Sequence, residues 1–306
     1  MKIGILEPEA FSKFALDALK LKGDVQEYNG ELLNEFLMDK DVLFIRLAYK
    51  MDHDFLRDAP KLKYICSPTT GLNHIDLDEV KRREISIISL KGESDFLQKI
   101  RATPEHIFGV TIALLRNYKK AFNHKTLAKW DRDICKGNEI FGKKVGIIGV
   151  GRIGKILIEY FNVFGATVFG YDNCDVNING ITFCSSITEL IKSSEIIIIS
   201  INYSIENHEV LNDKYIDLMK DKWIINCSRG EVIKERYFLD KLKEHWFKGV
   251  AVDVISNENK PNSNLSEWLS LSKNDNIILT PHMGGCTVES MERTEVFISN
   301  KLINQL

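Results

Sequence analysis

The sequence has little net charge and no concentration of basic residues. Its 306 residues include 41 Lys and Arg against 43 Asp and Glu, which leaves a formal net charge of -2. The basic residues are scattered along the chain. Nucleic acids and anionic membranes attract proteins through clustered positive charge, so we expect neither as a partner.

Long apolar runs and paired cysteines are also missing. Purely apolar stretches such as residues 196–199 are far shorter than the roughly 20 residues of a membrane-spanning helix. The N-terminus does not resemble a signal peptide. The six cysteines are widely spaced and form no C-x-x-C pair. We therefore expect a cytoplasmic protein with reduced thiols, no membrane segment and no metal site.

Short apolar segments alternate with amphipathic ones along the whole chain. We expect helices at residues 9–20, 104–117 and 287–306. The alternation predicts an α/β fold with parallel sheets. The expected strands are residues 2–6, 42–45, 64–66, 85–89, 145–148, 167–171, 195–201, 223–227, 249–252 and 276–279.

A glycine-rich turn follows the apolar segment 145–148. Gly149 permits a tight turn, Gly151 lets the backbone approach a pyrophosphate, and Gly154 lets the next helix pack close to the strand. The first-turn amides of Arg152 and Ile153, together with the helix dipole, would favour an anion.

Asp172 closes the next apolar segment, eighteen positions after Gly154. A carboxylate there can accept hydrogen bonds from ribose hydroxyls and would repel a 2'-phosphate. A glycine-rich turn alone is weak evidence. With the strand, the helix and the acid in place, the sequence predicts an NAD site and favours NAD over NADP.

Three later segments each place ionisable residues after an apolar strand. They supply Arg229, then Asp253 and Glu258, then His282. The carboxyl ends of parallel strands meet at one edge of the sheet, so these residues could converge there. Each alone also has a structural interpretation: Arg229 as a cap or surface partner, Glu258 as a solvated loop acid, and His282 as a turn residue.

Together these segments resemble a known family over nearly the whole chain. It is the family of D-isomer-specific 2-hydroxyacid dehydrogenases, which includes D-3-phosphoglycerate, D-lactate and glyoxylate/hydroxypyruvate dehydrogenases. The resemblance rests on Arg229-Gly230, on the runs 253–258 and 280–285, and on residues 70–76. It implies that His282 is the acid/base, that Glu258 is its partner, and that Arg229 anchors the substrate carboxylate and carbonyl.

The resemblance also implies a set of binding residues. Asp253 would meet the carboxamide side of the nicotinamide. Cofactor contacts are expected from Thr70, Gly149, Gly151, Arg152, Ile153, Gly154, Asp172, Ile201, Cys227, Ser228, Asp253, Gly284 and Gly285. Substrate contacts are expected from Arg46, Thr70, Gly71, Arg229 and His282.

These residue types suit the implied reaction on a small 2-hydroxy or 2-keto acid. Hydride transfer to a 2-keto carbon puts negative charge on the carbonyl oxygen, and an imidazolium can neutralise it near neutral pH. Glu258 would favour the charged imidazole and fix its orientation. Arg229 would offer a rigid fork to a carboxylate.

The resemblance predicts the domain organisation as well. A flavodoxin-like substrate domain would comprise residues 1–97 and 286–306, and a Rossmann-like NAD-binding domain, residues 98–285, would be inserted in it. A homodimer through the coenzyme domains is implied. Because the chain ends at Leu306, we expect no appended regulatory domain of the kind found in long phosphoglycerate dehydrogenases.

Some questions stay open at this stage. Arg46, after the apolar residues 44–45, could hold a distal phosphate as in phosphoglycerate dehydrogenases, or could pair with a neighbouring carboxylate; Ala48 stands where some relatives have a second basic residue. The charged segment 91–101 is interpreted as a solvated loop. An NAD(H)-sensing protein of the corepressor type is the alternative to an enzyme.

Overall fold

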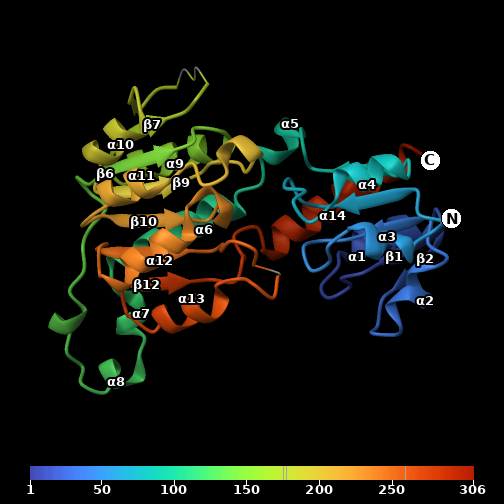
Figure 1. The fold of residues 1–306 in the computed structure, drawn as a ribbon, viewed down its shortest axis with the longest axis horizontal. Coiled ribbons are helices and arrows are strands. Elements are labelled where there is room, and N and C mark those ends of the chain that lie inside the picture. Colours follow the sequence, from blue (N-terminus) through green and yellow to red (C-terminus); the bar gives the residue numbers. More distant parts are fainter. Residues whose placement is uncertain (175, 177, 259) are drawn as a thin grey trace. The chain divides into compact units, whose positions relative to one another are not determined.

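The computed structural model describes residues 1–174, 176, 178–258 and 260–306, except for the side chain of His124. By its internal contacts the chain divides into two units (Figure 1). The first unit comprises Met1–Ile100 and Cys286–Leu306, and the second comprises Arg101–Gly285. The sequence interpretation placed these boundaries after residues 97 and 285.

The first unit is built on a parallel sheet. Among its described residues, five strands pair in the order β2-β1-β3-β4-β5, which is the flavodoxin-like order. The strands are β1 (Lys2–Ile5), β2 (Asp24–Glu27), β3 (Val42–Phe44), β4 (Tyr64–Ser67) and β5 (Ser86–Ser89). The helices are α1 (Lys13–Lys20), α2 (Leu33–Leu37), α3 (His53–Arg57), α4 (Leu77–Arg82), α5 (Ser94–Leu97) and α14 (Val288–Ile303).

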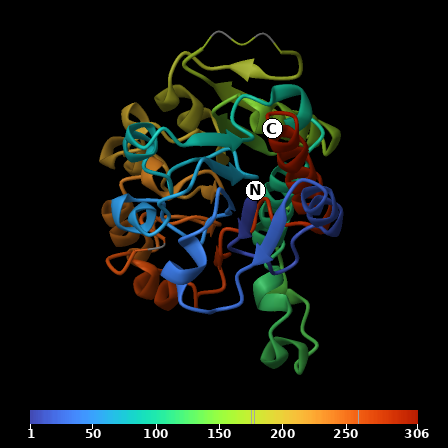
Figure 2. The same ribbon diagram turned by 90° about the vertical axis from the view of Figure 1, so that its right-hand side faces the viewer.

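Helices cover both faces of this sheet. Leu19 of α1 and Ile298 of α14 are buried against one face, and Figure 2 shows the two helices side by side. Phe36 of α2, Leu56 of α3 and Val80 of α4 belong to the apolar cluster on the other face. The C-terminal helix therefore completes the unit that the N-terminal residues begin.

The prediction of a solvated loop over residues 91–101 is wrong for the apolar residues of this segment. Leu97 and Ile100 are buried in the cluster that contains Ile298. The ring of Phe96 stacks on that of Phe297 with their centroids 4.0 Å apart. Because the segment contains several charged residues, its apolar contact with α14 was not predicted from the sequence.

The second unit carries a larger parallel sheet. Its described residues form seven strands in the order β12-β11-β10-β9-β6-β7-β8, which contains the Rossmann order. The strands are β6 (Lys144–Ile148), β7 (Thr167–Tyr171), β8 (Thr182–Phe183), β9 (Ile196–Ile199), β10 (Trp223–Asn226), β11 (Gly249–Val252) and β12 (Ile277–Leu279). The helices are α6 (Ala102–Leu115), α7 (Tyr118–Ala121), α8 (His124–Leu127), α9 (Arg152–Val163), α10 (Ile187–Ser193), α11 (Asp213–Leu218), α12 (Glu235–Lys243) and α13 (Leu265–Leu271), with the 3-10 turns η1 (Asp133–Cys135), η2 (Ile205–Asn207) and η3 (Gly230–Val232).

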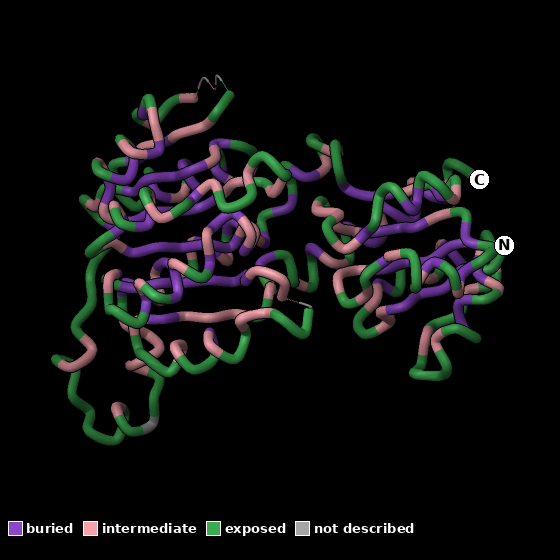
Figure 3. Tube along the Cα trace, viewed as in Figure 1, coloured by how far each residue is buried: buried purple, intermediate pink, exposed green. Residues whose placement is uncertain are grey.

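Strand β9 shows why this sheet is apolar on both faces. Ile196 and Ile198 lie in the cluster with α6 and α9. Ile197 and Ile199 lie in the cluster with α10, α11 and α12. Because helices cover both faces, a parallel strand reads as a continuous apolar run, and Figure 3 shows these strands buried. The predicted fold class, α/β with two parallel sheets, is confirmed.

The second unit contains an exposed segment between α6 and β6. It contains α7, α8 and η1 and is visible as the green loop of Figure 1. Phe122 is 70% exposed and Trp130 is 88% exposed. Nowhere in the described parts of the chain does a helix combine the length and the apolar character needed to cross a bilayer.

Candidate active site

The glycine-rich turn connects β6 to α9. Gly149 has φ +95°, and a Cβ atom on it would lie 2.4 Å from the carbonyl oxygen of Ser200. A Cβ on Gly154 would lie 2.3 Å from the carbonyl oxygen of Gly149. Gly151 differs, because its Cβ position has no atom within 4 Å. Two glycines are thus required by close packing, and the third leaves open space before the N-terminus of α9.

Asp172 is fixed beside this turn. Its Oδ2 accepts a hydrogen bond from the backbone amide of Val150 at 2.7 Å, and its Oδ1 accepts one from the amide of Cys174 at 3.0 Å. Each carboxylate oxygen keeps a further lone pair for a ribose hydroxyl. Arg152 starts α9; burial and the nearby Arg101 lower the pKa of its guanidinium, which stays charged because the ordinary value lies far above neutrality.

The three proposed catalytic residues follow adjacent strands. Arg229 comes after β10, Glu258 after β11 and His282 after β12. These strands pair directly with one another. Since all are parallel, their carboxyl ends open at the same edge of the sheet.

Asp253, directly after β11, holds the loop that carries His282. Its Oδ1 accepts hydrogen bonds from Thr280 Oγ1 at 2.5 Å and from the amide of Met283 at 2.9 Å, and its Oδ2 accepts one from the amide of Gly284 at 2.8 Å. The amide of His282 donates to the carbonyl of Asp253 at 2.8 Å. The expected contact of Asp253 with the nicotinamide stays a prediction; its contacts in the structure orient the histidine loop.

His106 of α6 supports the same carboxylate and was not anticipated from the sequence. Its Nε2 lies 3.4 Å from Asp253 Oδ1 and 3.3 Å from Thr280 Oγ1. Burial by itself would raise the pKa of Asp253, but the hydrogen bonds from His106, Thr280 and the loop amides outweigh burial and lower it. The aspartate is therefore ionised at neutral pH, which suits an acceptor of several hydrogen bonds.

His282 and Glu258 form a close pair. The Nδ1 atom of His282 lies 2.5 Å from Oε1 of Glu258, so the ring donates to the carboxylate through Nδ1. The Nε2 atom of His282 has no hydrogen bond to any residue in the described part of the chain. His282 has φ +51° and Asn257 has φ +54°, both in the left-handed region that non-glycine residues rarely adopt. Backbone strain of this kind clusters at functional sites.

Arg229 is half-buried, and none of the described residues forms an ion pair with it. Its Nη1 donates to the carbonyl of Ser228 at 2.6 Å. Within the described ranges no carboxylate lies at ion-pair distance. Burial lowers the pKa of Arg229, and the charges of Glu258 and Glu231 oppose that effect. The guanidinium remains a cation with donors available for an anion.

Two further contacts shape these loops. The side chain of Asn226 donates to the carbonyl of Arg229 at 3.0 Å and accepts from the amide and hydroxyl of Ser228. A Cβ on Gly230 would lie 2.1 Å from the carbonyl carbon of Ile255, so the loop with Arg229 packs directly on the segment before Glu258. Of these two residues only Gly230 was singled out by the sequence, as part of the Arg229-Gly230 pair; the role of Asn226 was not predicted.

The remaining predicted residues of the second unit lie at the ends of its strands. Ile201 follows β9, and Cys227, whose pKa is raised by burial, follows β10. Gly285 is the last residue of the unit, and its Cβ position is open. The described residues contain no group of three or more His, Cys, Asp or Glu placed to hold a metal ion.

Arg46, Thr70 and Gly71 belong to the first unit. Thr70 and Gly71 follow β4, and their amides donate to no acceptor among the residues with described positions. Arg46 follows β3, and its Nη2 lies 2.6 Å from Oε1 of Glu295. Its proposed role as a phosphate ligand stays a prediction, and its contacts are considered below.

Family models match both units. Residues 9–97 match the catalytic domain, and residues 108–284 the NAD binding domain, of the D-isomer specific 2-hydroxyacid dehydrogenases. The chain belongs to this family. It thereby joins a family of NAD-dependent oxidoreductases, and its second unit contains the family's NAD-binding domain.

Several relatives show how the family varies. The chain is 29% identical to the D-3-phosphoglycerate dehydrogenase of Methanocaldococcus jannaschii over 98% of its own length, and spans 57% of that protein. It is also 29% identical to a glyoxylate reductase of Thermofilum pendens, covering 89% of this chain and 80% of the relative. A D-lactate dehydrogenase from Aquifex aeolicus, solved with NAD and lactic acid, superposes with a TM-score of 0.85 at 25% identity over 100% of this chain and 95% of that one.

Proposed function

We propose that the protein transfers a hydride between NAD(H) and a small D-2-hydroxy acid or the corresponding 2-keto acid. The observation that carries the proposal is the pairing of His282 Nδ1 with Glu258 at 2.5 Å, with the half-buried Arg229 close enough to feel the charge of Glu258. A paired imidazole and an available guanidinium are the two groups that this reaction requires from the protein.

His282 acts as the acid/base through Nε2. Glu258 occupies Nδ1 and thereby fixes the ring orientation and the position of the remaining proton. In the reductive direction Nε2-H gives its proton to the carbonyl oxygen of the substrate, and in the oxidative direction neutral Nε2 takes the hydroxyl proton. The hydrogen bonds of the His282 loop to Asp253 hold the backbone of this segment in place.

Arg229 binds the substrate carboxylate and polarises the adjacent carbonyl. Its planar guanidinium presents two parallel donors to a carboxylate, which an ammonium group cannot do. Partial burial strengthens this attraction because solvent screens it less. We further propose the amides of Thr70 and Gly71 as carboxylate ligands, since no described residue accepts their hydrogen bonds.

The glycine-rich turn fits a dinucleotide. The open space at Gly151 and the first-turn amides of α9 would hold the pyrophosphate, and Asp172 would hold the adenosine ribose. When bound, NAD supplies or accepts the hydride at its nicotinamide ring. Contacts of Ile201, Cys227, Ser228, Gly284 and Gly285 with the cofactor are part of the same proposal.

Asp172 is expected to set the preference for NAD. Asp172→Asn keeps an acceptor for the amide of Val150 but removes the charge that repels a 2'-phosphate. We expect the ratio of kcat/KM for NADH over NADPH to fall about 10- to 100-fold, as expected for loss of a charge-assisted hydrogen bond. Steady-state kinetics with both cofactors measure this ratio. An unchanged ratio would contradict the ribose role.

The direct test of the function is oxidation of NADH with a panel of 2-keto acids. We expect turnover with at least one small member of the panel and formation of the 2-hydroxy acid. Tight NADH binding without turnover on any of them would reject the enzymatic proposal and favour an NAD(H)-sensing role.

We also propose that the protein forms a homodimer through its coenzyme unit. Large apolar side chains are exposed there, with Val163 84% and Phe141 75% exposed in addition to Trp130 and Phe122. Brought together, such side chains would form the contiguous apolar patch that marks an interaction surface, and tryptophan is enriched among the residues that dominate interface energy.

Trp130→Asn tests this assembly. Trp130 has φ +48°, a conformation that asparagine tolerates, so the substitution removes the ring without new backbone strain. We expect light scattering to give twice the chain mass for the unmodified protein and a shift toward the chain mass for the variant. Lys129→Asn, at the preceding exposed residue, should leave the mass unchanged. A monomeric unmodified protein would refute the homodimer.

A further inference from the structure

We infer that the substrate carries no second anionic group, and that the protein discriminates against phosphorylated 2-keto acids in favour of those with a short uncharged substituent. The inference rests on the proposed function. It comes from the carboxyl edge of the first unit's sheet, where Glu295 already pairs with the guanidinium of Arg46 and Glu7 already accepts from the neighbouring amides.

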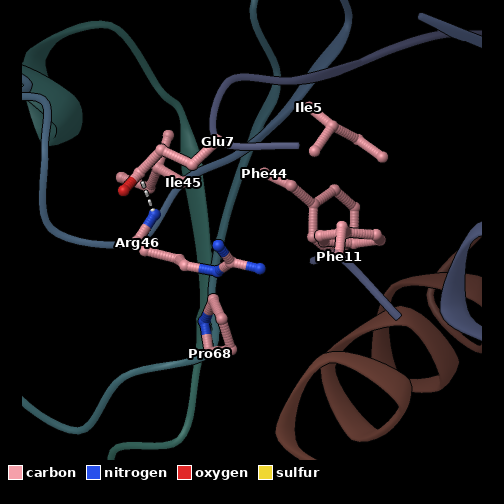
Figure 4. A pocket seen from close by; sticks show the side chains of 7 residues that line it. All are labelled: Ile5, Glu7, Phe11, Phe44, Ile45, Arg46 and Pro68. Carbon is pink, nitrogen blue, oxygen red and sulfur yellow. Dashed lines mark hydrogen bonds between the residues drawn. The ribbon is translucent and has the colours of Figure 1, made fainter. Parts of the chain in front are cut away.

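Arg46 is engaged through all three of its guanidinium nitrogens. Its Nε and Nη2 donate to Oε1 of Glu295 at 3.0 and 2.6 Å, and its Nη1 donates to the carbonyl of Glu9 at 2.9 Å. Figure 4 shows the side chain extending past Pro68 in a pocket that Phe11 and Glu7 also line.

Glu295 cannot easily release this partner. Its side chain on α14 is 1% exposed. It also accepts the amide of Ser12 at 2.6 Å, so it belongs to the packing between α14 and the start of α1. Turning Arg46 toward a phosphate would leave a buried carboxylate without its cation, which is strongly unfavourable. The ion pair thus holds Arg46 in a structural role.

The backbone amides at and after Arg46 are also occupied by a carboxylate. The carboxylate of Glu7 accepts hydrogen bonds from the successive amides of Arg46, Leu47 and Ala48 at 2.5, 3.3 and 3.2 Å. Consecutive amides of this kind form a concavity that binds anions. Here an internal carboxylate fills it, and a phosphate would meet the negative charge of Glu7.

The other cation of the loop after β3 is Lys50. Its Nζ pairs with Asp52 at 3.0 Å, and its side chain is 63% exposed, so its charge is both paired and screened. In contrast, the amides of Thr70 and Gly71 after the neighbouring strand β4 have no acceptor among described residues. The loop after β4 therefore provides amides for one carboxylate, and in the loop after β3 both cations, Arg46 and Lys50, are already paired with carboxylates.

The test compares hydroxypyruvate with 3-phosphohydroxypyruvate, which differ only by the phosphate. We expect kcat/KM for NADH-dependent reduction to favour hydroxypyruvate by at least about 10-fold, because like charges placed together disfavour a ligand strongly. Equal or better use of the phosphorylated substrate would overturn the inference while leaving the proposed function intact. No turnover with either of these substrates or with glyoxylate and pyruvate would overturn both.

Two variants examine the mechanism of the discrimination. Glu295→Gln releases Arg46 from its charged partner, so the preference for hydroxypyruvate should fall about 10-fold, the effect of making one cation available. The double variant Arg46→Gln/Glu295→Gln removes both charges and should keep the preference of the unmodified protein. A selective loss of phosphohydroxypyruvate reduction in the double variant would show that Arg46 binds the phosphate, against the inference.

Discussion

Replacing His282 by asparagine should lower kcat on the order of 10²- to 10⁴-fold, because it removes a positioned acid/base. Asparagine is the suitable replacement since it tolerates the φ of +51° at this position. The amide of residue 282 would still donate to the carbonyl of Asp253, so the loop should keep its path. Steady-state kinetics with NADH and a 2-keto acid measure the loss, and fluorescence titration checks that NADH still binds.

Glu258→Gln is the matched companion of this variant. The amide oxygen can still accept from His282 Nδ1, but the charge is lost. We expect kcat to fall about 10- to 100-fold, since a hydrogen bond to a charged group is replaced by a neutral one. Activity of the His282 variant within tenfold of the unmodified protein, or a larger loss from Glu258→Gln than from His282→Asn, would contradict the assigned roles.

Replacing Arg229 by lysine should damage substrate affinity and turnover together. Lysine keeps the charge but loses the planar pair of donors that grips a carboxylate in both the ground state and the transition state. We expect kcat/KM for the 2-keto acid to fall roughly 100-fold, with contributions from KM and kcat, because two hydrogen bonds to a charged group are affected.

Arg236→Lys serves as the control for this substitution. Arg236 lies on α12, where it is exposed and pairs with Asp240 and Glu267 rather than with any of the proposed site residues. The Arg236→Lys variant should keep the kinetic constants of the unmodified protein. Unchanged kinetics in Arg229→Lys as well would show that Arg229 does not hold the substrate carboxylate.

The sequence was most informative where apolar runs are buried on both faces. The segment 196–199 was expected inside a strand and is one, because a parallel strand covered by helices on both sides requires apolar residues throughout. The edge strand Asp24–Glu27 was not expected, since its side chains are mostly exposed and form no apolar run. The helix expected from residue 9 begins at Lys13, where the side chain of Ser12 caps it by accepting from the amide of Ala15.

The sequence could predict where the proposed site residues fall relative to the strands, but not which distant residues contact the loops that carry them. Arg229, Glu258 and His282 each follow an apolar strand, and that order already places them at one sheet edge. His106 contacts Thr280 across 174 positions of sequence, and Arg46 contacts Glu295 across 249. No local pattern encodes such pairs, because they depend on how elements distant in sequence pack.

The most direct test of the account follows the hydride itself. The protein is incubated with NADH deuterated at both C4 positions and with the 2-keto acid, other than glyoxylate, that it reduces best. The product is examined by mass spectrometry and chiral chromatography. The account predicts a D-2-hydroxy acid with a single deuterium atom at C2. An L or racemic product, or a product without deuterium at C2, would contradict hydride transfer at the site formed by Arg229, Glu258 and His282.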